Sequence, residues 1–184
     1  MTLYRDEIPS PIGTIVVVSD DEALRALDFD DHAERFHELL RRHYGDVDLE
    51  PRRERLGIRK RLEAYFGGDL HAIDDLPTRT NGTKFQTAVW AALRTIPVGT
   101  TTSYGELASA LGNPAATRAV GLANGANPVG IVVPCHRVIG ANGTLTGYGG
   151  GLERKAWLLR HERAAFVGSA EPIADAEREL TLFA

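Results

Sequence analysis

Residues 103–125 read SYGELASALGNPAATRAVGLANG and carry the signals of two short helices in succession. Ser103 and Glu106 have the three-residue spacing of a capping box, which predicts that a helix begins there. Gly112 ends that helix, and Asn113, followed by a proline, is a suitable N-cap for a second helix that runs to the end of the stretch. Two short helices joined by a tight turn predict a helix-turn-helix.

The sequence on both sides of this stretch predicts further helices and a buried strand. Residues 83–86, TKFQ, form another capping box, so a helix should begin at Thr83. Residues 131–133, IVV, are expected to form a buried strand that turns at 134–138, PCHRV, and leads into a glycine-rich loop. The last helix should span about 152–163. Helical spacing places two groups of apolar residues on buried faces: Phe85, Val89, Ala92, Leu93 and Ile96 of the first helix, and Ala156, Trp157 and Leu159 of the last.

The first half of the chain reads as strands followed by helices. TIVVVS (14–19) is rich in β-branched residues and LRALDF (24–29) alternates apolar with other residues, so both predict strands. Helices are expected over about 31–43 and 55–66. Residues 69–82 have little periodicity and are interpreted as a linker between two halves.

The expected fold class is therefore α/β, more strictly α+β. It combines a strand-rich N-terminal domain with a mainly helical C-terminal domain that contains the helix-turn-helix. We assign residues 1–82 to the N-terminal domain with its linker, 83–163 to the C-terminal domain, and 164–184 to an acidic tail with a short helix near 174–183.

Composition and charge limit the function classes. The 184 residues are 43% hydrophobic and 25% charged, as in ordinary globular proteins, and no apolar stretch approaches the roughly 18 residues that span a bilayer. The start lacks a secretion signal, and one cysteine cannot form an internal disulfide, so we expect a cytoplasmic protein. Residues 83–163 carry 8 Lys/Arg against 3 Asp/Glu in a chain of formal charge −4, which indicates an anionic partner or, alternatively, an uneven scatter of solvated charges.

The single cysteine, Cys135, lies in the PCHRV turn. A free cysteine is often a small buried hydrophobe, but Pro134 forces a turn at the thiol, and His136 and Arg137 add a base and a permanent cation beside it. A nearby base or positive charge increases the fraction of thiolate, which is the nucleophilic form. The other histidines have no metal-ligand spacing, so we expect no metal site.

Two further side chains in the helix-turn-helix are candidates for binding. Arg118 lies in the second helix among small residues, which would let the helix approach another polymer with the guanidinium projecting; the alternative is a solvated surface charge. Tyr104, at the start of the first helix, is either a half-buried aromatic or a phenol that meets a phosphate at a helix N-terminus.

These motifs, in this order and spacing, resemble one known family. PCHRV, with YGELA, RAVG and ANPV before it and GYGGGLERKAWLLRHE after it, is similar to the O6-alkylguanine-DNA alkyltransferases, also called methylated-DNA–protein-cysteine methyltransferases. The match covers residues 83–163. It implies direct-reversal DNA repair, in which a damaged guanine is flipped out of double-stranded DNA and its alkyl group moves irreversibly to the protein's own cysteine, with no cofactor.

The resemblance also implies roles for the reacting residues. Cys135 would attack the alkyl carbon on O6, and His136, through a water, would take the thiol proton. Glu162 would orient the imidazole and Asn127 would support the active-site turn. Tyr104 would help to rotate the 3′ phosphate and donate a proton toward the leaving guanine.

The remaining implied roles concern DNA and the alkyl pocket. Arg118 would enter the base stack in place of the extruded base, from the minor groove and without sequence preference. We expect a monomer without membrane contact, and leave cooperative binding along DNA open. The other residues carried over are the DNA contacts Ala116, Thr117, Ala119 and Arg137, and the pocket residues Pro134, Val138, Tyr148 and Gly149.

Two other functions would use part of the same set of motifs. A damage-binding module without chemistry would lack the cysteine, and Cys135 argues against it. A cysteine hydrolase would use a base from a distant segment, whereas His136 is adjacent to the thiol in sequence. One departure from the family also stands in the pocket, since Gly149 occupies a position where some members have a serine that contacts the base.

Overall fold

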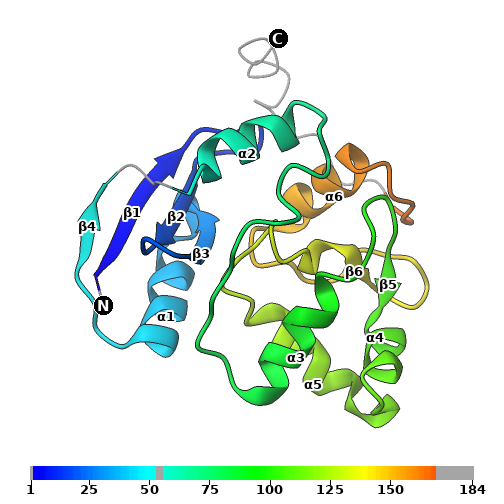
Figure 1. Cartoon of the computed structure of the whole chain (residues 1–184). Helices are drawn as coiled ribbons and strands as arrows, with labels where there is room; N and C mark the ends of the chain where they lie inside the picture. Colours follow the sequence, from blue (N-terminus) through cyan, green and yellow to red (C-terminus); the bar gives the residue numbers. More distant parts are fainter. Residues whose placement is uncertain (1, 53–55, 169–184) are drawn as a thin grey trace. The chain divides into compact units, whose positions relative to one another are not determined.

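The computed structural model describes residues 2–52 and 56–168. These form two compact units, which divide between Asn81 and Gly82. Figure 1 shows the first unit, from blue to cyan, with the strands of a sheet, and the second, from green to orange, made mainly of helices. The predicted α+β fold class is confirmed. The acidic tail assigned to 164–184 lies, from residue 169 onward, outside the described residues, as does its short helix near 174–183.

The first unit is built on a four-stranded sheet of order β3-β2-β1-β4. β1 pairs antiparallel with β2, and β2 with β3, while β4 runs parallel to β1 at the edge. Every residue of β2 is buried, as its β-branched sequence predicts for a central strand. The sequence did not indicate the three-residue edge strand β4. The strand bounds are β1 Leu3–Ile8, β2 Ile15–Ser19, β3 Leu24–Phe29 and β4 Leu49–Pro51.

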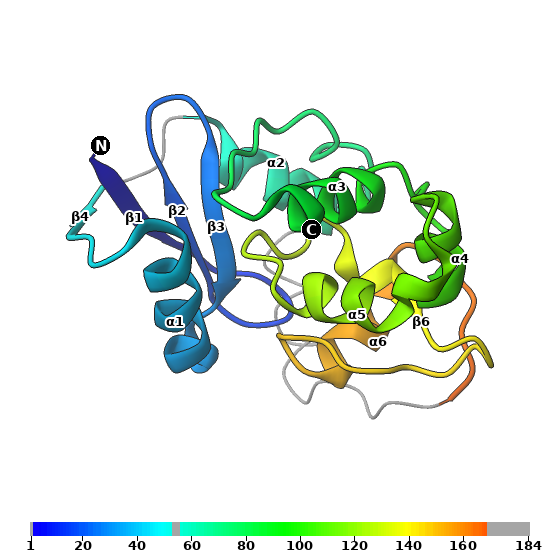
Figure 2. The same ribbon diagram turned by 90° about the horizontal axis from the view of Figure 1, so that it is seen from below.

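Two helices belong to the first unit. α1, Ala33–Tyr44, starts two residues later than predicted because a 3₁₀ turn (η1, Asp30–His32) precedes it, and it ends at a glycine with positive φ. Figure 2 shows α1 across one face of the sheet, where Phe36 and Leu40 pack on apolar residues of the strands. α2, Ile58–Phe66, begins after Gly57, whose φ is +72°.

The second unit consists of short helices and one pair of two-residue strands. Both capping boxes form as predicted: Thr83 with Gln86, and Ser103 with Glu106. α4 and α5, separated by a turn at Gly112, pack against each other as a helix-turn-helix, and Figures 1 and 2 both show α5 beside α3 and α4. The element bounds are α3 Lys84–Leu93, β5 Thr102–Ser103, α4 Tyr104–Ala110, η2 Pro114–Ala116, α5 Thr117–Gly125, η3 Cys135–Arg137, β6 Val138–Ile139 and α6 Leu152–His161.

Two details of these helices differ from the prediction. Phe85, expected on the buried face of α3, is 37% exposed, whereas Trp90 is buried and its indole N–H donates to Ala123 O at 2.9 Å. This bond ties α3 to α5. Asn113 precedes the 3₁₀ turn η2 and makes no side-chain cap there, and α5 begins only at Thr117.

The predicted strand at 131–133 is wrong. These three residues are buried, but they form turns, and Ile131 has a φ of +66°. Hydrophobicity alone does not separate a buried strand from a buried loop. The loop is tolerated in the interior because a buried asparagine side chain satisfies its backbone groups.

The pair of short strands fixes the position of the cysteine turn. β5 pairs in parallel with β6, with Thr102 opposite Val138 and Ser103 opposite Ile139. β5 leads directly into α4, and β6 directly follows η3. The start of the helix-turn-helix is therefore held beside the end of the turn that contains the cysteine.

No helix within the described ranges has both the length and the apolar composition needed to cross a bilayer. The same ranges contain no group of three or more His, Cys, Asp or Glu side chains arranged to hold a metal ion.

Candidate active site and DNA-binding helix

The cysteine occupies the first position of η3, the turn that the proline predicted. The amide of Cys135 donates to Val133 O at 2.8 Å, and that of Arg137 donates to Pro134 O at 3.0 Å. Cys135 carries a free thiol and keeps an exposed fraction of 7%. The turn therefore holds the thiol in a largely dry environment without sealing it completely.

Asn127 fixes the loop that leads into this turn. Its side-chain amide donates to Val133 O at 2.8 Å, and its side-chain oxygen accepts from the amide of Val129 at 3.0 Å. Asn127 is buried. Unpaired backbone groups are costly in the interior, so the asparagine replaces the partners that a strand would otherwise supply.

The two residues that follow Cys135 form a buried hydrogen-bond network with Glu162. His136 Nε2 lies 3.0 Å from Glu162 Oε1. Arg137 donates from Nε to Glu162 Oε2 at 2.8 Å, from Nη2 to Oε1 at 2.9 Å, and from Nη1 to Ile96 O at 2.7 Å. All three side chains are almost fully buried. The carboxylate is therefore shared between an imidazole and a guanidinium, out of contact with water.

The electrostatics of this network leave the imidazole neutral. Burial lowers the pKa of His136; Glu162 opposes this shift, and Arg137 and Lys155 add to it. Burial alone would raise the pKa of Glu162, but its charge interaction and hydrogen bond with His136, and then its hydrogen bonds and charge interaction with Arg137, outweigh burial and hold the pKa well below its usual range. A neutral His136 donates from Nε2 to the carboxylate. Its buried Nδ1, which bonds to no described residue, then carries a lone pair.

Arg137 does not have the position expected of a DNA contact. It is 4% exposed, and its donors point to Glu162 and to Ile96 O. The predicted DNA contact is therefore wrong for this structure, because a buried, paired guanidinium does not meet a phosphate. Arg137 instead neutralises Glu162.

Lys155 of α6 is a cation that the sequence reasoning missed. It is fully buried, and its ammonium donates to Val138 O at 2.6 Å, Thr146 O at 2.7 Å and Gly147 O at 3.4 Å. Burial lowers the pKa of Lys155 to about 8, and the charge of Cys135 opposes this shift. Lys155 thus interacts electrostatically with Cys135. Lys155 lies three and four residues before the buried residues 158 and 159, so helical spacing places it on the same buried face. This spacing could have indicated its burial from the sequence.

Tyr104 connects the helix-turn-helix to the glycine-rich loop. The hydroxyl of Thr146 donates to Tyr104 Oη at 3.1 Å, and Thr146 O also accepts from Lys155. A Cβ at Gly121 would lie 3.7 Å from the Tyr104 ring, so α5 passes close to the phenol. Because its oxygen accepts from Thr146, the Tyr104 proton is free to be donated elsewhere.

The helix-turn-helix presents an exposed face of mainly small residues. Arg118 is exposed and makes no ion pair with any described residue. Thr117 and Ala119 are also exposed, and Ala116 is partly so. The opposite face is buried at Val120 and Ala123. The predicted DNA contacts in this motif, unlike Arg137, therefore all lie at the surface.

The predicted pocket residues lie around the cysteine turn. Pro134 and Val138 flank η3 and are buried. The Tyr148 ring is perpendicular to the His136 ring, with centroids 6.5 Å apart. Gly149 is partly buried in the loop that follows.

Comparisons with known proteins match both units. The model described as "6-O-methylguanine DNA methyltransferase, ribonuclease-like domain" matches residues 3–80, and that described as "6-O-methylguanine DNA methyltransferase, DNA binding domain" matches 84–164. The chain belongs to the 6-O-methylguanine DNA methyltransferase family. The predicted family is therefore confirmed, and the family match extends to the first unit, beyond the residues 83–163 that carried the resemblance.

Relatives and solved structures of the 6-O-methylguanine DNA methyltransferase family agree with this assignment. The methylated-DNA–protein-cysteine methyltransferase of Shigella flexneri is 50% identical over 169 residues, which cover 88% of this chain and 96% of that protein. The Mycobacterium bovis protein of the same name is 46% identical over 173 residues, covering 89% and 94%. The crystal structure of Mycobacterium tuberculosis OGT in complex with DNA has a TM-score of 0.74 and 42% identity, covering 89% of this chain and 93% of that one.

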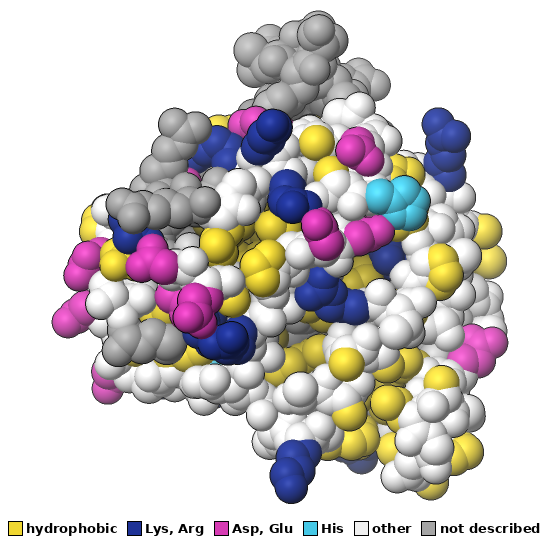
Figure 3. Space-filling view, viewed as in Figure 1, with side chains coloured by type: hydrophobic (Ala, Val, Ile, Leu, Met, Phe, Trp, Pro, Cys, Tyr) yellow, Lys and Arg dark blue, Asp and Glu magenta, His cyan; other side chains and the backbone are white. Residues whose placement is uncertain are grey.

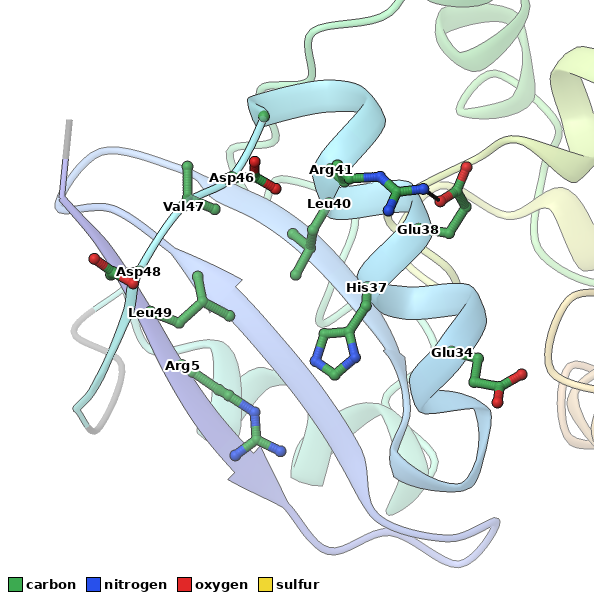
Figure 4. A pocket seen from close by; sticks show the side chains of 11 residues that line it. Arg5, Glu34, His37, Glu38, Leu40, Arg41, Asp46, Val47, Asp48 and Leu49 are labelled. Carbon is green, nitrogen blue, oxygen red and sulfur yellow. Dashed lines mark hydrogen bonds and ion pairs between the residues drawn. The ribbon is translucent and has the colours of Figure 1, made fainter.

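A pocket in the first unit lies away from these residues. It has a volume of about 900 Å³ and lies between α1 and the edge of the sheet. Figure 4 shows His37 directed from α1 into this space and Arg41 paired with Glu38 beside it.

Figure 3 shows acidic side chains gathered over the first unit, and few on the visible face of the second. The basic excess of residues 83–163 thus falls in the second unit.

Proposed function

We propose that this chain repairs O6-alkylguanine in double-stranded DNA by moving the alkyl group onto Cys135 in a single turnover. The activity, that of a methylated-DNA–protein-cysteine methyltransferase, is confirmed at the level of the family by the relatives. One arrangement supports the assignment to Cys135. The next residue, His136, is a neutral histidine hydrogen-bonded to the buried carboxylate of Glu162, and the buried ammonium of Lys155 interacts electrostatically with the thiol.

The proposed chemistry follows from the orientation of His136. Glu162 holds Nε2–H, so Nδ1 is the nitrogen that accepts the thiol proton, through a bridging water. The sulfur attacks the alkyl carbon, and an S–C bond forms as the C–O6 bond breaks. The electron pair of that bond stays on the guanine, toward which Tyr104 donates a proton. The positive charge of Lys155 stabilises the thiolate before the attack.

The product explains why the proposed reaction stops after one turnover. The sulfur is both nucleophile and final acceptor, so no cofactor is required for the transfer. A thioether has no good leaving group that water could displace, so the thiol is not regenerated. Each molecule is therefore consumed by one lesion.

DNA binding in this proposal uses the exposed face of the helix-turn-helix. The small residues Ala116, Thr117 and Ala119 allow a close approach to the minor groove, and Arg118 fills the space of the flipped base. Phosphate contacts supply most of the affinity, so binding is independent of sequence and sensitive to salt. We propose a monomer that works in the cytoplasm, as a single reduced cysteine suggests.

Intact-mass spectrometry tests this proposal. After incubation with a duplex that contains one O6-methylguanine, the protein should gain about 14 Da, located in the peptide with Cys135 and limited to one transfer per molecule. Cys135→Ser should bind the same duplex without a change in mass. If the wild type released methylated product repeatedly with its thiol intact, hydrolysis would replace repair as the function, and a mass gain in Cys135→Ser would place the acceptor elsewhere.

A further inference from the structure

The side chain of Leu122 is unusually exposed. It leaves 71% of its surface in water, compared with 58% for Val167, 44% for Leu152 and 37% for Phe85, the other large exposed hydrophobic residues that are described. Single exposed leucines are common on protein surfaces and need no explanation by themselves. Leu122 differs because of its position on α5.

Arg118 and Leu122 of α5 are both exposed, are separated by four residues and so are neighbours on the helix surface. They lie about 6 Å apart along the axis. The other exposed residues of α5 and of the turn before it have small or short side chains: Pro114, Ala115, Thr117, Ala119 and Gly125. Arg118 and Leu122 are therefore the side chains that project from an otherwise shallow surface.

The charge of this region favours a polyanion over another protein as the occupant. Residues 83–163 carry 8 Lys/Arg against 3 Asp/Glu. The carboxylate of α4, Glu106, is held in its capping box by the amide of Ser103 and the hydroxyl of Thr102. No acidic side chain lies on α5, which leaves the charge of Arg118 unopposed beside Leu122.

We propose that Leu122 is a second projecting contact of this helix, which packs in the minor groove against sugars and base edges next to the position of Arg118. This inference rests on the proposed function, because it assigns a DNA-binding role to a further residue of the same face. Large apolar side chains act in this way in minor-groove proteins, where they wedge against base steps. With Arg118 in the place of the flipped base, Leu122 supports the neighbouring nucleotides.

An apolar contact has a signature that differs from that of a phosphate contact. Leu122 releases no counterion, so its loss weakens binding without changing the dependence of affinity on salt. It donates no hydrogen bond, so the loss is the same for different sequences. Burial of most of a leucine side chain corresponds to a change in affinity of roughly tenfold.

Fluorescence anisotropy with a short unmodified duplex, repeated at several salt concentrations, tests the proposal. Leu122→Ala should bind roughly tenfold more weakly with an unchanged salt slope, and Leu122→Met should keep most of the affinity. Leu152→Ala, an equivalent truncation at an exposed position of α6, serves as the matched control and should bind as the wild type does. Equal affinities for Leu122→Ala and the wild type would overturn the proposal, as would a change in slope of about one.

Two further measurements separate this inference from its alternatives. Sedimentation without DNA shows whether Leu122→Ala alters self-association; a loss of self-association with normal DNA affinity would make this face a contact with a second copy and sink the proposal. At saturating O6-methylguanine duplex, Leu122→Ala should still gain the methyl group on Cys135. A failure of transfer in the wild type would overturn the proposed function, whereas the anisotropy result on unmodified DNA would stand independently.

Discussion

Replacement of Glu162 by Gln tests the buried network most directly. The change preserves the shape of the side chain but removes its negative charge. The buried Arg137 guanidinium then has no opposite charge, and the new amide NH₂ group at position 162 points at N–H donors of Arg137. Loss of one partner from a buried ion pair typically costs about 3–5 kcal/mol, because the remaining charge is uncompensated. We therefore expect the free energy of unfolding to fall by about this amount at pH 7.

The pH dependence supplies a second, independent expectation. The pKa of Glu162 is held well below its usual range in the folded chain, so this group binds a proton more readily when unfolded. Its stabilising contribution is complete above the unfolded pKa of about 4.3 and is lost as the pH falls below it. The difference between wild type and Glu162→Gln should accordingly shrink by up to about 1.4 kcal/mol per pH unit in that acidic range.

Urea unfolding followed by the fluorescence of the two tryptophans measures both effects. Glu153→Gln is the matched control: it makes the same chemical change at an exposed position of the same helix, and should shift stability by less than about 1 kcal/mol. The rate of methyl transfer should also fall in Glu162→Gln, by roughly 10²–10⁴, because His136 loses the carboxylate that orients it. Stability and transfer rate equal to those of Glu153→Gln would refute the reasoning.

Two further predictions concern α6 and α3. Lys155→Met removes a group whose pKa in the folded chain is about 8. Between about pH 8 and 10.4 this lysine is protonated in the unfolded wild type but not in the folded one, so the stability of the wild type relative to the variant should rise by up to about 1.4 kcal/mol per pH unit. Parallel pH profiles of the two proteins in urea unfolding would contradict this. A Cβ at Gly82 would lie 2.6 Å from Trp90 Cη2, so Gly82→Ala should lose about 1–3 kcal/mol. Gly125→Ala, where a Cβ meets nothing within 4 Å, is the control, and equal urea midpoints for both variants would count against the clash.

Local chemistry explains which parts of the fold were predictable. The capping boxes at Thr83 and Ser103 involve groups three residues apart, and both formed as expected. β2 was visible because a run of β-branched residues fits a central strand. Residues 131–133 were wrongly predicted to form a strand because they are apolar, as the residues of a buried strand are. Their conformation depends on hydrogen bonds from Asn127, which no local pattern reveals.

The same distinction applies to the candidate site. The sequence showed that a thiol, an imidazole and a guanidinium are adjacent, but not where each side chain points. Arg137 pairs with Glu162, 25 residues further along, and so was misassigned to DNA. Lys155 was overlooked because lysine is usually a surface residue, although it lies on the apolar face of its helix. The site roles themselves stay predictions until the variants are measured.

The arrangement of charges explains why four buried ionic or titratable groups surround one thiol. In the proposed reaction the proton moves from Cys135 to His136, which would create a thiolate and an imidazolium in a dry environment, where an unpaired charge is costly. Glu162 already contacts the histidine side of this new pair, and Lys155 is coupled to the sulfur side, so each new charge meets an existing opposite one. Arg137 also pairs with Glu162 and lowers the pKa of His136, so it limits the rise in that pKa which the carboxylate causes. In the proposed reaction Glu162 and Lys155 thus offset part of the cost of separating charge, while burial keeps the resting imidazole neutral.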